Sequence, residues 1–224
     1  LQANEVQPPA ASPASTARTD DDGIDRTPKF YIGGKQVRAD SGYSRDVLGP
    51  SGAVLAQVGE GNRKDIRNAV EAAVKASAWS KASTHNRAQV MYYIAENLEA
   101  RRGEFIGRLQ QQTGTGKAAA RREFDTAISR LFSYAAWADK FDGATHTTPM
   151  RGIAMSVYEP CGVMGIACPG QAPLLGFISL VAPAIAMGNR VIAIPSEAHP
   201  LSALDLYQVF DTSDLPAGVV NIVC

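Results

Sequence analysis

A turn that follows an apolar segment holds the side chains of this sequence that are best placed for chemistry. Residues 162–167 are mainly apolar, the turn 168–173 contains the amide of Gln171, and a second apolar run covers 174–187. This strand–turn–helix order predicts that the turn lies at the carboxyl end of a parallel strand. Open α/β sheets bind their ligands at that edge.

Cysteine chemistry is the other possibility in this region. The sequence holds three cysteines, Cys161, Cys168 and Cys224, and their spacing matches neither a zinc site nor a disulfide framework. Cys168 lies in the turn, but its apolar surroundings offer no group placed to lower the pKa of a thiol. We therefore expect it to be buried and inert. The three histidines are scattered, so the sequence predicts no metal site.

Composition and charge exclude several classes of protein. Lysine plus arginine and aspartate plus glutamate each number 22, so the net charge is zero and predicts no nucleic-acid partner. The apolar run 174–187 is shorter than the roughly 20 residues that span a bilayer, and no signal peptide is visible. Together with unpaired cysteines, this predicts a cytoplasmic protein with no membrane partner. A first residue other than Met suggests excision from a longer polypeptide.

The elements before residue 150 are predicted to form hairpins followed by a helical layer. Residues 1–28, rich in Pro, Ala and Ser, are expected to be a disordered linker or tail, and folding should begin near residue 29. Residues 30–37 predict a hairpin with a Gly-Gly turn, and residues 46–58 a second extended pair. Three helices should follow. Their predicted apolar faces carry Ile66, Val70, Ala73 and Val74; Val90, Ile94, Leu98, Phe105, Ile106 and Leu109; and Phe124, Ile128, Leu131, Phe132, Ala135 and Trp137.

Asn62 is the expected N-cap of the first of these helices, and Gly114 with Gly116 should end the second, which starts at Thr84 or His85. The third should cover 117–141. We expect its aromatic residues to lie in the core.

Strands and helices alternate from residue 152 onward. Strands are predicted over 153–158, 162–167, 191–194 and 219–223, with helices over 174–187 and 201–210. Such alternation implies a parallel sheet with right-handed crossovers. The predicted fold class is α/β, an N-terminal helical layer plus the first half of a Rossmann-like sheet. A half-sheet would expose an unpaired strand edge.

Residues 159–224 contain four diagnostic segments, in the order EPCGVMG, APAIAMGN, PSEAHPLSAL and LPAGVVNIV. Two shorter segments, YIGGK and WADK, come earlier in the chain. This series resembles the aldehyde dehydrogenase family, over about residues 29–224. The resemblance implies the N-terminal part of the NAD-binding domain, a small-molecule aldehyde that is oxidised to a carboxylic acid, and NAD(P) as cofactor. It also implies a short oligomerisation strand near 152–158 and hence a homo-oligomer.

Two departures from the family pattern fall where the resemblance implies chemistry. The family has Trp-Asn where this chain has Gly170 and Gln171, and Lys where it has Ile194. The family asparagine donates a hydrogen bond to the oxyanion, so Gln171 is the candidate catalytic residue, with its amide on a stem one methylene longer. The lysine and the following glutamate flank the adenosine ribose. The cofactor-binding residues implied by the resemblance are Ala167, Pro169, Gly170, Ile194, Ser196 and Glu197.

Glu197 also has a simpler interpretation, as a carboxylate favouring the first turn of the following helix. No functional role is needed for that.

Two hypotheses about function follow from the resemblance. In the first, the segment is a non-catalytic pseudoenzyme or scaffold module, as in two-module members of the family that carry a degenerate second copy. In the second, it is the working cofactor half of an active NAD-dependent enzyme. The family's cofactor glycine turn, catalytic glutamate and nucleophilic cysteine would all come after residue 224. The remainder of the same polypeptide is therefore an expected partner.

Overall fold

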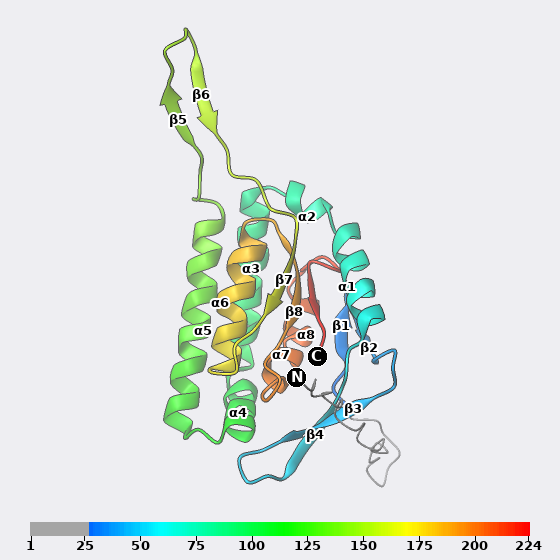
Figure 1. Cartoon of the computed structure of the whole chain (residues 1–224). Helices are drawn as coiled ribbons and strands as arrows, with labels where there is room; N and C mark the ends of the chain where they lie inside the picture. Colours follow the sequence, from blue (N-terminus) through cyan, green and yellow to red (C-terminus); the bar gives the residue numbers. More distant parts are fainter. Residues whose placement is uncertain (1–26) are drawn as a thin grey trace, which may run out of the picture.

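The computed structural model describes residues 27–224 (Figure 1). Its centre is a five-stranded sheet in the order β2-β1-β9-β8-β7. The predicted parallel strands are confirmed as β7 (Val163–Ala167), β8 (Arg190–Ile194) and β9 (Val220–Ile222). The linker predicted over 1–28 falls almost wholly outside the described residues.

The first hairpin extends this sheet. β1 (Phe30–Ile32) and β2 (Lys35–Val37) pair around the predicted Gly-Gly turn, whose glycines both have positive φ. Sequence patterns did not predict that β1 also pairs antiparallel with β9. The buried Asn221 of β9 holds the junction, because its Oδ1 accepts from the N–H of Gly33 (2.9 Å) and its Nδ2 donates to the carbonyl of Val191 (3.2 Å).

The second extended pair and the first helix also match the prediction. β3 (Ser44–Leu48) and β4 (Val54–Gly59) form a separate two-stranded antiparallel sheet. Asn62, the predicted N-cap, directly precedes α1 (Arg63–Lys75). The side chain of Asn62 accepts the N–H of Asp65, and the carboxylate of Asp65 accepts the N–H of Asn62, which completes a capping box.

The predicted apolar face of α1 is wrong in part. Val70 and Val74 are 39% and 55% exposed, whereas Ala69 and Ala73 are buried against the sheet. Small side chains on the buried face let the helix backbone come close to its neighbours. A Cβ at Gly218 would lie only 2.5 Å from a carbonyl oxygen of α1. The short distance between α1 and its neighbours therefore favours alanine over the larger valine on the buried face of this helix.

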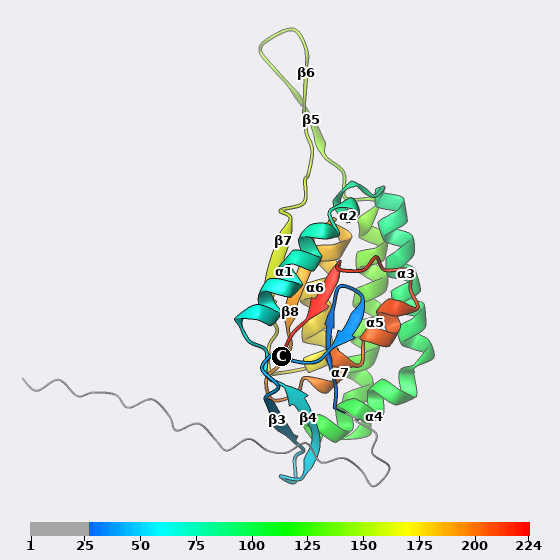
Figure 2. The same ribbon diagram turned by 90° about the vertical axis from the view of Figure 1, so that its right-hand side faces the viewer.

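Helices cover both faces of the sheet (Figure 2). α6 (Pro173–Ala186) lies against one face with α3 (Thr84–Ala100) and α5 (Lys117–Ala138) packed outside it, and α1 lies on the other face. α6 lies between the sheet and the helices α3 and α5, and most of its residues are buried. In the part of the chain from 27 onward, no helix has both the length and the apolar character needed to cross a bilayer.

Two predicted helices are each divided in the structure. The helix predicted from Thr84 or His85 to Gly114 is divided at Arg101, whose N–H donates to the carbonyl of Leu98. α4 (Arg102–Thr113) follows the break and ends at Gly114, which has a left-handed backbone conformation. All six apolar residues predicted for this face are buried despite the break. The helix predicted over 201–210 is divided into α7 (Leu201–Leu204) and α8 (Tyr207–Asp211).

The prediction that the aromatic residues of the third helix lie in the core is wrong at its C-terminal end. Trp137 is 59% exposed and makes an edge contact with Phe141, whose ring centroid lies 4.6 Å from that of Tyr158. These three residues form an exposed aromatic cluster. Phe141 and Tyr158 flank, in sequence, a hairpin that projects from the rest of the fold (Figure 1). The hairpin pairs β5 (Ala144–Thr147) with β6 (Ile153–Ser156), the strand predicted near 152–158. Phe132 is only partly buried, while Phe124, Ile128, Leu131 and Ala135 are buried as predicted.

Side chains from other elements satisfy the C-terminal end of α6. Trp79, in the short helix α2 (Ala78–Lys81), donates from Nε1 to the carbonyl of Ile185 (2.9 Å), and Arg87 of α3 donates from Nε to that of Ala186 (2.9 Å). Both side chains are buried. These bonds replace the intrahelical partners that the last carbonyls of any helix lack.

Replacing Arg87 by Met should therefore destabilise the protein. Met keeps an apolar stem but leaves the buried carbonyl of Ala186 without its charged donor, at a cost of about 1.5–3 kcal/mol. Urea unfolding measures the change in the free energy of unfolding. Arg130→Met, at an exposed position of α5, is the control and should change that free energy by less than about 0.5 kcal/mol. Equal effects of the two substitutions would contradict the capping role of Arg87.

Candidate functional site

The two turns that carry the predicted site lie side by side at the carboxyl ends of β7 and β8. Ala167 and Ile194 are register partners at the ends of these parallel strands. The N–H of Cys168 donates to the carbonyl of Ile194 at 2.8 Å. A Cβ built on Gly170 would lie 3.9 Å from Oγ of Ser196. The structure thus places the turn predicted from the strand–turn–helix order beside the turn at Ile194–Ser196, which the family resemblance had singled out.

The first turn presents an exposed amide on a strained backbone. Gln171 and Gly170 are exposed, and Ala172 has φ 46° and ψ 63°, the left-handed region that alanine rarely adopts. Pro169 packs on the first turn of α6, where a Cβ at Gly176 would lie 2.6 Å from its Cγ. The close packing and the strained backbone together restrict the path of the turn that carries Gln171.

The second turn divides its polar groups between structure and solvent. Ser196 is 3% exposed, and its Oγ accepts the N–H of His199 at 3.1 Å. Glu197 is exposed, and α7 begins only at Leu201, so Glu197 lies outside the first turn of that helix. The interpretation of Glu197 as a carboxylate that favours the start of this helix stays a prediction.

The exposed side chains of this edge differ in polarity. The carboxylate of Glu197 is exposed and can accept hydrogen bonds. At Gly170, the nearest atom outside the chain neighbours to the position of an added Cβ is Oγ of Ser196, at 3.9 Å. Ile194, 45% exposed, has no donor to offer. The edge therefore presents an exposed hydrogen-bond acceptor beside an exposed apolar side chain.

Glu123 of α5 is a residue of this edge that sequence patterns did not predict. Its Oε1 accepts the N–H of Leu174 (3.0 Å) and of Leu175 (3.3 Å), at the start of α6. Burial raises the pKa of the Glu123 carboxyl, while the two N–H groups and the charge of His199 act to lower it. The contact joins residues 51 positions apart, so no local spacing could have indicated it.

The thiols near the site are not activated. Burial raises the pKa of Cys168 to about 11 and that of Cys224 to about 12, so both are protonated at neutral pH. Cys161 is exposed. The described residues contain no group of three or more His, Cys, Asp or Glu side chains that could hold a metal ion.

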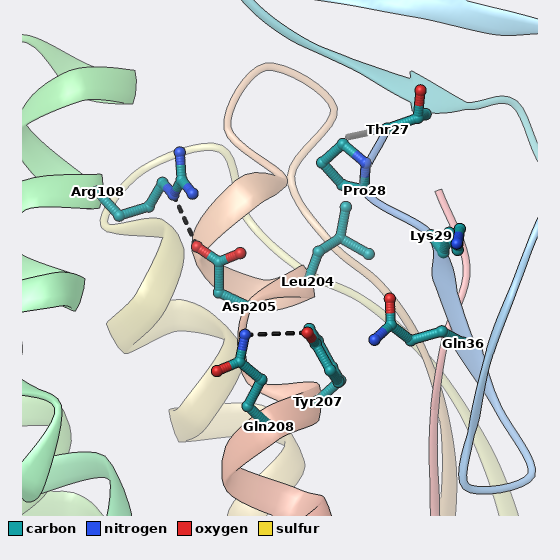
Figure 3. A pocket seen from close by; sticks show the side chains of 9 residues that line it. All are labelled: Thr27, Pro28, Lys29, Gln36, Arg108, Leu204, Asp205, Tyr207 and Gln208. Carbon is teal, nitrogen blue, oxygen red and sulfur yellow. Dashed lines mark hydrogen bonds and ion pairs between the residues drawn. The ribbon is translucent and has the colours of Figure 1, made fainter. Parts of the chain in front are cut away.

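A pocket of about 240 Å³ lies apart from the two turns (Figure 3). Within it, Nε of Arg108 lies 2.7 Å from Oδ2 of Asp205, and Gln208 donates to the hydroxyl of Tyr207. None of the predicted site residues lines this pocket. Its lining consists of Thr27, Pro28, Lys29, Gln36, Arg108, Leu204, Asp205, Tyr207 and Gln208.

Comparison with known proteins gives one consistent family. Residues 37–224 match the model of the aldehyde dehydrogenase family. A mitochondrial benzaldehyde dehydrogenase from Antirrhinum majus is 36% identical over 200 residues, which cover 87% of this chain and 38% of that protein. The human cytosolic 10-formyltetrahydrofolate dehydrogenase is 30% identical over 204 residues, 87% of this chain and 23% of that protein.

Solved structures agree with the sequence relatives. An aldehyde dehydrogenase from Bacillus cereus is similar with a TM-score of 0.85 at 29% identity, covering 88% of this chain and 41% of that one. A betaine aldehyde dehydrogenase from Staphylococcus aureus in complex with NAD⁺ has a TM-score of 0.84 at 26% identity, covering 88% and 40%. The chain spans less than half the length of each of these relatives, so it corresponds to one part of their fold. The chain belongs to the aldehyde dehydrogenase family and forms the N-terminal part of its fold.

Proposed function

We propose that this segment is a scaffold module, the first half of the NAD-binding domain in an aldehyde dehydrogenase polypeptide, and that it does not itself catalyse. The observation that supports this is the composition of the ligand edge. The exposed apolar Ile194 takes the place of the family lysine, and the exposed Gln171 that of the family asparagine. Each substitution removes or displaces a donor, whereas the packing around both turns is intact.

The reaction that we assign to the parent polypeptide is the NAD(P)-dependent oxidation of an aldehyde to a carboxylic acid. When bound, NAD⁺ would supply the hydride acceptor. In this chain, Glu197 would accept hydrogen bonds from the adenosine ribose, and Ala167, Pro169 and Gly170 would lie along the path of the nucleotide. The protonated thiols of Cys168 and Cys224 supply no nucleophile, so a cysteine elsewhere in the polypeptide would attack the aldehyde.

The alternative, a working cofactor half, is favoured by two observations. Glu197 is exposed at the edge, and Gly170 places no side chain beside Ser196. A nucleotide could then bind with one hydrogen bond fewer than in the family pattern.

The expected partners are the remainder of the polypeptide and a second copy of it. β7 is an edge strand of the sheet among the described residues, so a further strand could pair with it. The projecting β5–β6 hairpin, with Ile153 and Met155 each more than 70% exposed, and the exposed aromatic cluster would form the homo-oligomer contact. The cytoplasmic location and the absence of a nucleic-acid partner stay predictions.

Replacing Ile194 by Lys in the full polypeptide should tighten NAD⁺ binding. The new ammonium restores a charge-assisted hydrogen bond of about 1.5–3 kcal/mol, which corresponds to roughly one to two decades in Kd. Isothermal titration calorimetry measures Kd directly. Ile194→Met is the matched control, since it keeps an apolar side chain without charge and should leave Kd unchanged. An unchanged Kd in the Lys variant would show that Ile194 is not what limits binding.

Alkylation should separate the three thiols. At pH 8, a thiol of pKa about 11 is only about one-thousandth ionised, so Cys168 should react with iodoacetamide far more slowly than the exposed Cys161. Cys224, with a still higher pKa, should be slower again. Peptide mass spectrometry of the native protein after brief treatment gives the three rates. Rapid labelling of Cys168 would contradict its assignment as inert.

Replacing Phe141 by Ser should weaken self-association of the polypeptide, because it removes the central ring of the exposed aromatic cluster. Sedimentation velocity over a range of protein concentrations measures the shift toward smaller species. Tyr93→Ser is the control, because Tyr93 of α3 is 46% exposed, close to the 45% of Phe141, but lies outside the cluster. A Phe141 variant that sediments like the parent at every concentration would rule out this surface as the contact.

A further inference from the structure

The start of α6 has no cap of its own. Ala172 is the N-cap and makes no side-chain hydrogen bond, and Pro173 at the first helical position has no N–H. The next two amides, of Leu174 and Leu175, both donate to Oε1 of Glu123. A carboxylate from the neighbouring helix thus does what an N-cap residue does in most helices.

Glu123 is fixed in place by the packing of its own helix. Phe124, the next residue of α5, is fully buried, and α5 packs along α6. Asp125, on the same stretch of α5, bonds to Arg102 and contacts neither amide. Of the two acidic residues on this stretch, Glu123 alone reaches the first turn of α6.

The strained turn depends on this anchor. Ala172 holds a left-handed conformation directly before Pro173, and such a backbone persists only when its surroundings determine it. The Glu123 contact fixes the chain immediately after Ala172. Gln171 and Gly170 come immediately before it. Removing the anchor should therefore release the segment that carries the candidate oxyanion donor.

The second turn contacts the first directly. The N–H of Cys168 donates to the carbonyl of Ile194 at 2.8 Å, and the N–H of His199 donates to Oγ of the buried Ser196 at 3.1 Å. A shift of the first turn would therefore reach the second through the pairing of the strand ends.

We propose that Glu123 is a positioning residue, which holds the first amides of α6 and thereby fixes the turn at 168–172 beside the turn at 195–199. It touches neither substrate nor cofactor in this role. The inference rests on the proposed function, since the turns matter because they carry the nucleotide edge.

Amide hydrogen exchange in the full polypeptide tests the anchor directly. In Glu123→Ala, the amides of Leu174 and Leu175 should exchange about tenfold faster or more, and Glu123→Gln, which keeps an oxygen acceptor on the same stem, should restore most of the protection. Asp125→Ala is the control on the same helix and should leave both amides unchanged. Should the Ala variant fail to fold, Glu123→Asp, one methylene shorter, should give the same local increase. Unchanged exchange at both amides in folded variants would overturn the proposal.

A second measurement separates positioning from general support. NAD⁺ is titrated calorimetrically into the Ile194→Lys polypeptide with and without Glu123→Ala, and Kd should weaken about tenfold while Asp125→Ala has no effect. Faster exchange at the two amides with an unchanged Kd would reduce Glu123 to a structural cap and overturn the positioning role. If the Ile194→Lys polypeptide binds no NAD⁺ at all, the assignment of a repairable NAD⁺ edge fails. The exchange at Leu174 and Leu175 then still decides whether Glu123 holds the turn.

Discussion

The structure depends on a helix that cannot satisfy its own ends. α6 is apolar and buried at most of its positions, and side chains of other elements complete the hydrogen bonds of its terminal groups. Glu123 accepts hydrogen bonds from the amides at the N-terminal end, and Trp79 and Arg87 donate hydrogen bonds to the carbonyls at the C-terminal end. The helical layer and the sheet are joined through these bonds as well as through apolar contact. Losing one leaves a buried polar group unpaired, and for that reason such contacts are costly to break.

The same arrangement explains how side chains at the ligand edge can be substituted while the fold is kept. The positions of both turns are set by strand pairing, by Pro169 against Gly176 and by the Glu123 contact. The groups that would meet a nucleotide, at Gln171, Ile194 and Glu197, are exposed and hold nothing together. Substitution at these exposed positions is thus nearly free of structural cost. A module can keep the family's architecture while its ligand chemistry changes.

Local patterns predicted the strand–helix–strand core and the Gly-Gly hairpin, because turn residues and apolar runs determine both. They did not predict contacts made by single side chains far apart in sequence. The pairing of β1 with β9 through Asn221 is one such contact, and the Glu123 bonds to α6 are another. Spacing also identifies an apolar face without showing what covers it. Trp137 directly precedes the buried Ala138 of α5 but is itself 59% exposed, and on α1 the smaller Ala69 is buried where Val70 is exposed.

The projecting hairpin and the ligand edge share one stretch of chain. β6 ends at Ser156 and β7 begins at Val163, so residues 157–162 alone separate the arm from the strand that leads into the first turn (Figure 1). Tyr158 in this stretch also belongs to the exposed aromatic cluster. A displacement of the arm would therefore act, through residues 157–162, on an edge strand that pairs only with β8 among the described residues. Chain connectivity alone would link the position of the arm to the geometry of the first turn.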